Sequence, residues 1–168
     1  MGSEMCIRDR FIIYGDHGNA LPKKAYESLF NRELTTLEYR RLLLNIPIIF
    51  YDPSGTIYNS MDSSQIDSIL SQTKSNTDMY RTILNLLGIE TDENYYGVNM
   101  FSGEPTFSYD PKNWDIITDD FIYNKKNDVY ECFNGGALND EVIQYVLNYR
   151  KKQDNYLNTL IYTSNKKK

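Results

Sequence analysis

The sequence predicts an α/β fold in which a small sheet flanked by helices is followed by an antiparallel β-meander subdomain and a C-terminal helix. Two short apolar runs at 11–14 and 47–51 are typical of buried strands, and helical patterns lie between and after them. From 95 to 133 the pattern changes to short β-prone segments separated by Asn, Asp, Lys and Gly. Since two strands do not make a stable sheet, we interpret the first half as one flank of a larger one.

Length and composition indicate one domain, or one domain with a small appendage. The chain has 168 residues, of which 40% are apolar. Its formal net charge is -5 and its basic residues are scattered apart from 166–168, which argues against a nucleic-acid partner. We find no signal-peptide pattern and no apolar run of about 18 residues, so no transmembrane segment is expected in this chain. Cys6 and Cys132 lack the spacing of zinc ligands or of a disulfide framework.

The first ten residues show no periodicity. Residues 5–10, MCIRDR, resemble the conceptual translation of a transposase adapter used in sequencing libraries. We therefore expect 1–10 to be a non-native leader and the native sequence to begin at or near Phe11.

Two helical patterns lie between the apolar runs. The first spans about 23–30 and ends near Asn31. Thr35 and Glu38 have the spacing of a capping box, which predicts a second helix over about 36–45.

The segment after the second apolar run is less regular. Residues 56–75 are predicted as a loop with room for a short helix. A clearer helix begins at 75–78, is closed by Gly88 and is expected to pack on the sheet. Its expected inward face consists of Met79, Ile83, Leu86 and Leu87.

The second half is predicted to be a meander closed by a helix. Its expected strands are 95–97, 114–118, 121–123 and 129–133. Residues 124–128 are the expected hairpin loop, and 134–136 end the sheet. The last helix is expected to start near Asn139, with a frayed basic tail. Its expected inward residues are Val142, Ile143, Val146, Leu147, Leu157, Leu160 and Ile161.

The polar turn after the first strand carries the principal candidate site. The strand at 11–14 runs into Gly15, and Asp16 then stands beside His17, the only histidine of the chain. A carboxylate and a neutral imidazole are suitable ligands for Zn or Mn, and Gly15 and Gly18 permit the turn that lets both reach one ion. Asp16 and His17 are therefore candidate metal ligands. The alternative is an ordinary turn with an Asp cap and a solvent-facing His.

Other candidate residues have simpler interpretations. Asp52 could lie near the same sheet edge, but we prefer a plain turn. The pair Asp119 and Asp120 is interpreted as a solvated loop. Trp114 could stack a sugar or a lipid headgroup, although a core aromatic is the preferred interpretation. No serine-hydrolase triad can be assembled, because no second histidine is present to activate the candidate serines Ser54, Ser63 and Ser64.

Several motifs in a fixed order together resemble a known family. They are YGDHG at 14–18, NIPIIFYDPSG at 45–55, TDMYRTILNLLGI at 77–89, YGVNMFS at 96–102 and IITDDFIY at 116–123. This series is similar to the lipoteichoic acid synthase and phosphoglycerol transferase group of the alkaline phosphatase and sulfatase superfamily. The likeness covers about 11–165.

The resemblance implies a domain organisation. Residues 11–94 would be the C-terminal part of a sulfatase-like α/β core, 95–137 an antiparallel β subdomain, and 138–168 a C-terminal helix with a basic tail. The chain would be N-terminally truncated, and the missing N-terminal half of the same protein would complete the core. The parent protein would be anchored in the plasma membrane, with an extracellular catalytic domain.

The resemblance also implies a mechanism. In the family a divalent ion, commonly manganese, is held by a glutamate, a threonine and an Asp-His pair, which Asp16 and His17 match. Zn, Mg and Ca are the alternative ions. The threonine attacks the phosphate of a phosphatidylglycerol-like lipid headgroup, and the glycerophosphate is passed to an acceptor. Because the threonine and glutamate lie upstream in the family, this chain is expected to contain no catalytic nucleophile and to be inactive alone.

Two alternatives stay open. One is a sulfatase or phosphodiesterase hydrolase of the same superfamily, and the identity of the upstream nucleophile would distinguish it from a transferase. The other is a non-catalytic fragment. The chain departs from the family at Gly18, where an aromatic residue is frequent, and at Asn99, where an aspartate is usual. The stretch 56–75 also looks longer than is typical.

Overall fold

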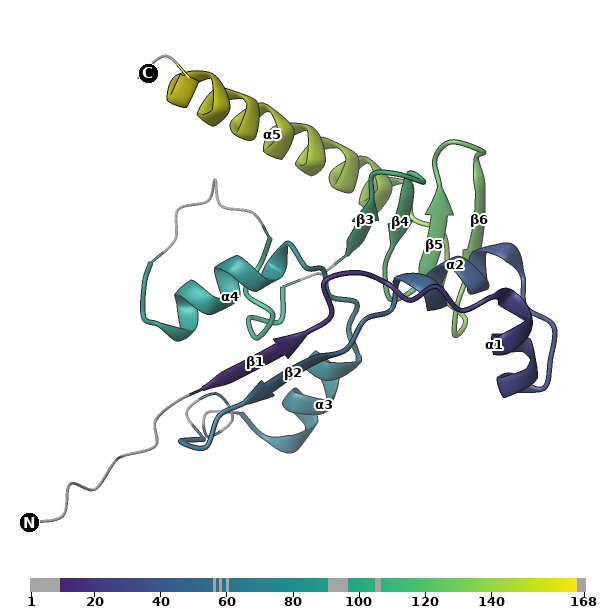
Figure 1. The fold of residues 1–168 in the computed structure, drawn as a ribbon, viewed down its shortest axis with the longest axis horizontal. Coiled ribbons are helices and arrows are strands. Elements are labelled where there is room, and N and C mark those ends of the chain that lie inside the picture. The colour runs from purple at the N-terminus through teal and green to yellow at the C-terminus, as the bar shows by residue number, and fades with distance from the viewer. Residues whose placement is uncertain are drawn as a thin grey trace, which may run out of the picture. The chain divides into compact units, whose positions relative to one another are not determined.

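The computed structural model describes residues 10–55, 57, 59, 61–90, 97–104 and 107–165. In these residues the fold is mixed α/β, with five helices, a two-stranded antiparallel sheet and a four-stranded antiparallel sheet (Figure 1). The chain divides into two compact units, the first extending to Ser71 and the second beginning at Gln72.

The first unit contains a two-stranded antiparallel ribbon. Strand β1 (Phe11–Tyr14) pairs antiparallel with β2 (Ile48–Tyr51), so that Tyr14 lies opposite Ile48. Both predicted strands are present, but the prediction that they are buried is wrong. Five residues of these strands are more than half exposed: Phe11, Ile13, Tyr14, Ile49 and Tyr51. Burial on both faces requires further layers, and a ribbon of two strands has few neighbours to supply them.

The first two helices begin and end as predicted. Helix α1 spans Lys23–Phe30, and Asn31 follows it with a φ of 51°, in the left-handed conformation common at helix C-caps. Helix α2 spans Thr36–Leu44 and begins with the predicted capping box. The Thr35 hydroxyl accepts from the Glu38 amide at 3.0 Å, and the Glu38 carboxylate accepts from the Thr35 amide at 2.8 Å.

A third helix, α3, spans Ser63–Ser71 within the stretch expected to be mostly loop. Asp62 and Gln65 fix its start by a reciprocal pair of bonds. The Asp62 carboxylate accepts from the Gln65 amide at 2.8 Å, and the Gln65 side chain accepts from the Asp62 amide at 2.9 Å. The helix therefore begins with a second capping box, built from Asp and Gln.

Helix α4 (Asp78–Leu86) opens the second unit and is tied to a following loop by buried polar groups. The Asp78 carboxylate accepts from the amides of Ser75, at 2.8 Å, and Val98, at 3.0 Å. The Thr82 hydroxyl accepts from the amide of Met100 at 3.0 Å. Burial raises the pKa of Asp78 and outweighs the opposing effect of the two amides.

The orientation of α4 differs in part from the prediction. Met79 is buried as expected, whereas Leu87 is 66% exposed, because the helix ends at Leu86 and the chain turns away through Gly88 at a φ of 71°. The hydrogen bonds of this helix join it to 97–100, and its packing on the sheet stays a prediction.

The four-stranded sheet is the predicted meander. Its strands are β3 (Ser108–Asp110), β4 (Asp115–Ile117), β5 (Phe121–Asn124) and β6 (Val129–Cys132), in the order β3-β4-β5-β6. Strand β3 was not predicted. The strand predicted at 95–97 lies outside the described residues except for Gly97, which is in a bend. Cys132 is half-buried and packs against the core of this sheet.

Helix α5 (Asp140–Asn165) packs its first turns against the meander (Figure 1). The buried cluster between them consists of Ile116, Phe121, Ile143 and Val146. The side chains of Leu157, Leu160 and Ile161 and the tail at 166–168 lie outside the described residues. In the part of the chain that the structure describes, no helix is both long and apolar enough to cross a membrane.

Gly97 and Gly88 provide a matched test of this packing. Both have a φ near 70°, but a Cβ at Gly97 would lie 2.3 Å from the carbonyl oxygen of Thr77, whereas a Cβ at Gly88 would meet nothing within 4 Å. We expect Gly88→Ala to lower the free energy of unfolding by about 1 kcal/mol. Gly97→Ala should lower it by at least about 2 kcal/mol more, because the steric clash is added to the same backbone strain. Urea denaturation measures both, and equal losses would contradict the packing described for 97–100.

Candidate functional site

The turn after β1 is bonded at one end to the connection between α2 and β2, and at the other end it lies against α2. The amide of Gly15 donates to the carbonyl oxygen of Pro47 at 3.1 Å. At Gly18 the backbone lies so close to α2 that a Cβ would be 1.9 Å from the Leu43 carbonyl oxygen. Only glycine therefore fits at position 18.

Asp16 and His17 form the exposed part of this turn. Their side chains are 87% and 82% exposed, and His17 Nε2 lies 3.6 Å from Asp16 Oδ1. The structure thus brings the two predicted ligand atoms to one side of the turn, although both residues follow the strand directly. This proximity requires the bend between Gly15 and Gly18, since successive residues of an extended strand point to opposite faces.

A hydrogen bond selects the tautomer of His17. Its Nδ1 lies 2.7 Å from the carbonyl oxygen of Gly18. A carbonyl oxygen can only accept, so Nδ1 carries the proton and the lone pair of the neutral ring is on Nε2, the atom nearest Asp16. The bond to Gly18 raises the pKa of His17, and the negative charge of Asp16 raises it further. Metal-binding histidines commonly donate their second ring N–H to a backbone carbonyl in this way.

The distance between the two ligand atoms is compatible with one shared ion. Metal–ligand distances of about 2.0–2.2 Å place two ligand atoms roughly 3–3.5 Å apart when the angle at the metal is about 90–110°. The observed 3.6 Å is close to that range. Among the described residues, however, no group of three or more His, Cys, Asp or Glu side chains could hold a metal ion. Asp16 and His17 therefore fit as part of a metal site rather than as a whole one.

Asp52 does not join this pair, because β1 and β2 are antiparallel. The end of β1 lies beside the start of β2, which leaves Asp52 at the opposite end of the ribbon. There its carboxylate accepts from the amides of Ser54, at 3.1 Å, and Ile57, at 2.8 Å. The hydrogen bond from the Ser54 hydroxyl has the largest effect on the pKa of Asp52. Together with the two amide bonds and the bond from Arg10, it lowers this pKa to about 2. These hydrogen bonds stabilise the fold at pH values above the ordinary pKa of an aspartate. The stabilisation is lost as the pH falls through about 2 and Asp52 takes up a proton.

Two of the serines considered as nucleophiles donate to neighbouring carboxylates. The hydroxyl of Ser54 donates to Asp52 at 2.5 Å, and that of Ser64 donates to Asp62 at 2.7 Å. Ser63 is the first residue of α3.

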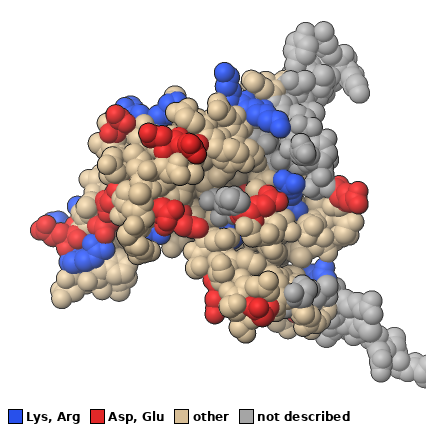
Figure 2. Space-filling view, turned by 180° about the vertical axis from the view of Figure 1, so that it is seen from behind, with Lys and Arg blue, Asp and Glu red and all other residues tan. Residues whose placement is uncertain are grey.

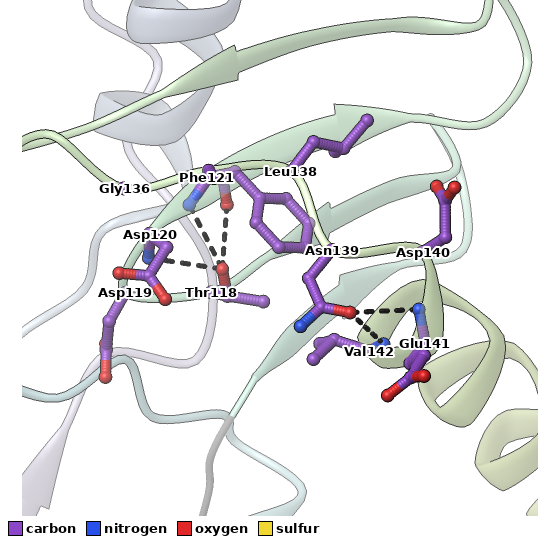
Figure 3. A pocket seen from close by; sticks show the side chains of 11 residues that line it. Thr118, Asp119, Asp120, Phe121, Gly136, Leu138, Asn139, Asp140, Glu141 and Val142 are labelled. Atoms are coloured by element: carbon purple, nitrogen blue, oxygen red, sulfur yellow. Dashed lines mark hydrogen bonds between the residues drawn. The ribbon is translucent and has the colours of Figure 1, made fainter.

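The second unit contains a hollow that sequence reasoning missed. It lies between the β4–β5 turn and the start of α5 and is lined by 118–121 and 136–142 (Figure 3). Asp119 and Asp120, interpreted from sequence as a solvated loop, lie on its rim. Asp119 also accepts a hydrogen bond from the amide of Thr73. The Asn139 side chain accepts from the amides of Glu141 and Val142 and caps α5 (Figure 3). The two segments are far apart in sequence, so no local motif signalled the hollow.

Trp114 is not a core residue, contrary to the preferred interpretation from sequence. It is 44% exposed and precedes β4 in a turn, with a φ of 61°. The core of the meander is formed by other residues, which leaves the indole at the surface. On the face shown in Figure 2, acidic and basic side chains are interspersed rather than gathered into separate fields.

Comparison of the chain with models of protein families, with curated proteins and with solved structures finds no match in any of the three. The functional assignment therefore rests on the geometry of the site and on the sequence motifs.

The hydrogen bond at His17 makes a prediction for its titration. Because the Gly18 carbonyl and Asp16 both favour the protonated ring, the midpoint should lie above the ordinary value of 6.5. Asp16→Asn should lower the midpoint only in part, since the bond to Gly18 stays. As His17 is the sole histidine, its ring signals in proton NMR need no assignment by mutation. A midpoint at or below 6.5 would show that the bond to Gly18 is not formed in solution.

Proposed function

We propose that this chain is the C-terminal part of a metal-dependent phosphoglycerol transferase of the lipoteichoic acid synthase type. Asp16 and His17 would supply two ligands to a divalent ion, with manganese the favoured metal. The observation that carries the proposal is the turn itself. The turn exposes Asp16 Oδ1 and His17 Nε2, which lie 3.6 Å apart just after a strand. Its backbone is held by contacts with Pro47 and Leu43.

The donor set supports manganese or zinc over a calcium-type site. An imidazole nitrogen beside a carboxylate suits transition metals, whereas calcium prefers oxygen ligands throughout. When bound, such an ion neutralises charge on phosphoryl oxygens and lowers the pKa of a hydroxyl nucleophile. Within this chain, the contribution is restricted to holding the ion. Asp16 supplies negative charge, and His17 is oriented by its bond to Gly18.

The incompleteness of the site supports the proposal that the chain belongs to a larger enzyme. Two ligands are fewer than a catalytic ion needs, and the described residues bring no third one to this turn. The exposed apolar face of the ribbon is likewise what one flank of a larger sheet would present. We therefore propose that the remaining ligands, the threonine nucleophile and the rest of a sulfatase-like sheet belong to a segment upstream of Phe11. The substrate would be a phosphatidylglycerol-like headgroup, and glycerophosphate would pass to an acceptor.

Manganese binding to the purified full chain tests the site. Mn²⁺ broadens nearby NMR signals, so substoichiometric addition should broaden the amides of 15–19 first. Asp16→Asn and His17→Ala should each weaken this effect by roughly tenfold or more, since each removes one of two ligands.

The acidic hollow offers the matched control. Asp119→Asn with Asp120→Asn removes two carboxylates from a second exposed site and should leave the broadening at 15–19 unchanged. If the strongest broadening in the unaltered chain falls on the hollow instead, Asp16 and His17 are not the preferred ligands.

The genomic sequence next to the Phe11 codon tests the wider proposal. We expect upstream codons contiguous with Phe11 that encode hydrophobic membrane segments, a threonine nucleophile and a glutamate ligand. Sequencing of the locus from genomic DNA would show this. A cysteine in a formylglycine motif at the nucleophile position would point to a sulfatase, and native codons for residues 5–10 would contradict the truncation.

A further inference from the structure

The turn between the meander and α5 contains the only Asn-Gly pair of the chain, Asn134 and Gly135. The pair follows β6, and both residues are exposed. Their φ values are 52° and 78°, and the amide of Gly136 donates to the carbonyl oxygen of Phe133 at 2.7 Å. Two positive φ values between bonded ends define a type I′ turn, so Asn134 and Gly135 are its two central residues.

Both ends of this turn lie against Asp120, in the connection between β4 and β5. The amide of Phe133 donates to the Asp120 carbonyl oxygen at 2.7 Å. Gly136 is so close that a Cβ there would lie 2.8 Å from Asp120 Cβ (Figure 3). A reaction of the turn in the folded chain must therefore proceed while its ends stay in place.

Ring closure by Asn134 meets that condition. In a succinimide the nitrogen of the next residue is joined to the Asn side chain, which sets ψ of the asparagine to about −120°, the value at the first central residue of a type II′ turn. Types I′ and II′ share the bond between their end residues and differ by the orientation of one peptide plane. Asn134 already has the positive φ that both types need, and Gly135 can change the sign of its φ because it has no Cβ.

The surroundings of Gly135 leave its nitrogen accessible. Among the described residues the structure gives its amide no hydrogen-bond acceptor, and a Cβ at this position would meet nothing within 4 Å. Asn31 is the contrasting case, since it is exposed and has a φ of 51° but is followed by Arg32. The Arg32 amide donates to the Glu27 carbonyl oxygen at 3.2 Å. The nitrogen after Asn31 is thus bonded and carries a residue with a bulky side chain.

We propose that Asn134 is a site of spontaneous deamidation in the folded chain. The Gly135 nitrogen attacks Asn134 Cγ, so that a bond between them forms and the bond from Cγ to Nδ2 breaks. Nδ2 leaves as ammonia with the proton of the Gly135 amide. Water then opens the ring at Cγ, which gives aspartate, or at the main-chain carbonyl carbon, which gives isoaspartate. This site is separate from Asp16 and His17 and does not depend on the proposed function.

The reaction changes the chain next to the hollow of the second unit. The new carboxylate is two positions before Gly136, which lies against Asp120 on the rim of the hollow. Isoaspartate also adds a methylene to the main chain between the two held ends of the turn. Deamidation therefore alters both the charge and the backbone at this place, and it needs no enzyme.

The test is incubation of the folded full chain at physiological temperature and mildly alkaline pH, followed by tryptic peptide mapping. Lys126 and Arg150 bound the peptide that contains Asn134. We expect this peptide to gain about one mass unit, with the change at position 134, and an isoaspartate methyltransferase assay to label it. Asn31 is the internal control, and its modification should be slower by roughly tenfold or more, because Arg32 lacks the freedom of glycine.

One variant and one further measurement separate the chemistry from the fold. Asn134→Gly accepts the same positive φ and lacks the side-chain amide, so its peptide should keep its mass while its thermal midpoint stays unchanged. The same mapping in guanidinium chloride gives the rate at Asn134 without the turn. The folded chain should react at a comparable rate, because the turn keeps its ends bonded during ring closure.

Mass gain only after unfolding would overturn the proposal, since the folded turn would then block ring closure. Equal rates at Asn31 and Asn134 would show that the turn and Gly135 give no advantage. A gain that persists in the Asn134→Gly variant would place the reaction at another residue of the peptide.

Discussion

The carboxylate of Asp78 joins parts of the second unit that are distant in sequence. It accepts from the amide of Ser75, which precedes α4, and from that of Val98 in the loop that follows, and it is almost fully buried. The neighbouring amide of Gly97 donates to the Tyr149 hydroxyl on α5 at 2.7 Å. Helix α4, the loop at 97–100 and α5 are thus connected through adjacent backbone groups. A buried charge stabilises such a connection only when its hydrogen bonds are made, so the loop must keep this path.

Local signals predicted local structure well. The capping box of Thr35 and Glu38 and the end of α1 near Asn31 depend on contacts within a few residues, and both are as predicted. The start of α3 carried the same kind of signal, since Asp62 and Gln65 have capping-box spacing. Burial was harder to predict, because it depends on what a strand packs against. An apolar run such as 11–14 has the same sequence pattern whether its faces are covered or exposed.

The two residues of the candidate site could be predicted from the sequence, but the arrangement of the residues around them could not. Sequence placed Asp16 and His17 at the end of a strand, and glycine on either side indicated the turn that brings them together. The antiparallel partner strand, which moves Asp52 to the far end of the ribbon, follows from pairing that no local pattern specifies. The exposure of Trp114 was missed for a similar reason. Its backbone is set by Asn124, ten residues away and on another strand.

The anchoring of the turn at both ends has an energetic consequence for ligand binding. The amide of Gly15 is bonded to Pro47, and Gly18 lies against Leu43. The backbone is therefore held on both sides of Asp16 and His17. Little chain entropy is left to be lost when an ion arrives, because folding has already ordered the backbone. In the proposed metal site, the affinity for an ion would then depend partly on residues 43–47, which supply none of the proposed ligands. Substitutions at 43–47 would make the backbone of the turn more mobile. They would weaken the proposed ion binding although Asp16 and His17 are unchanged.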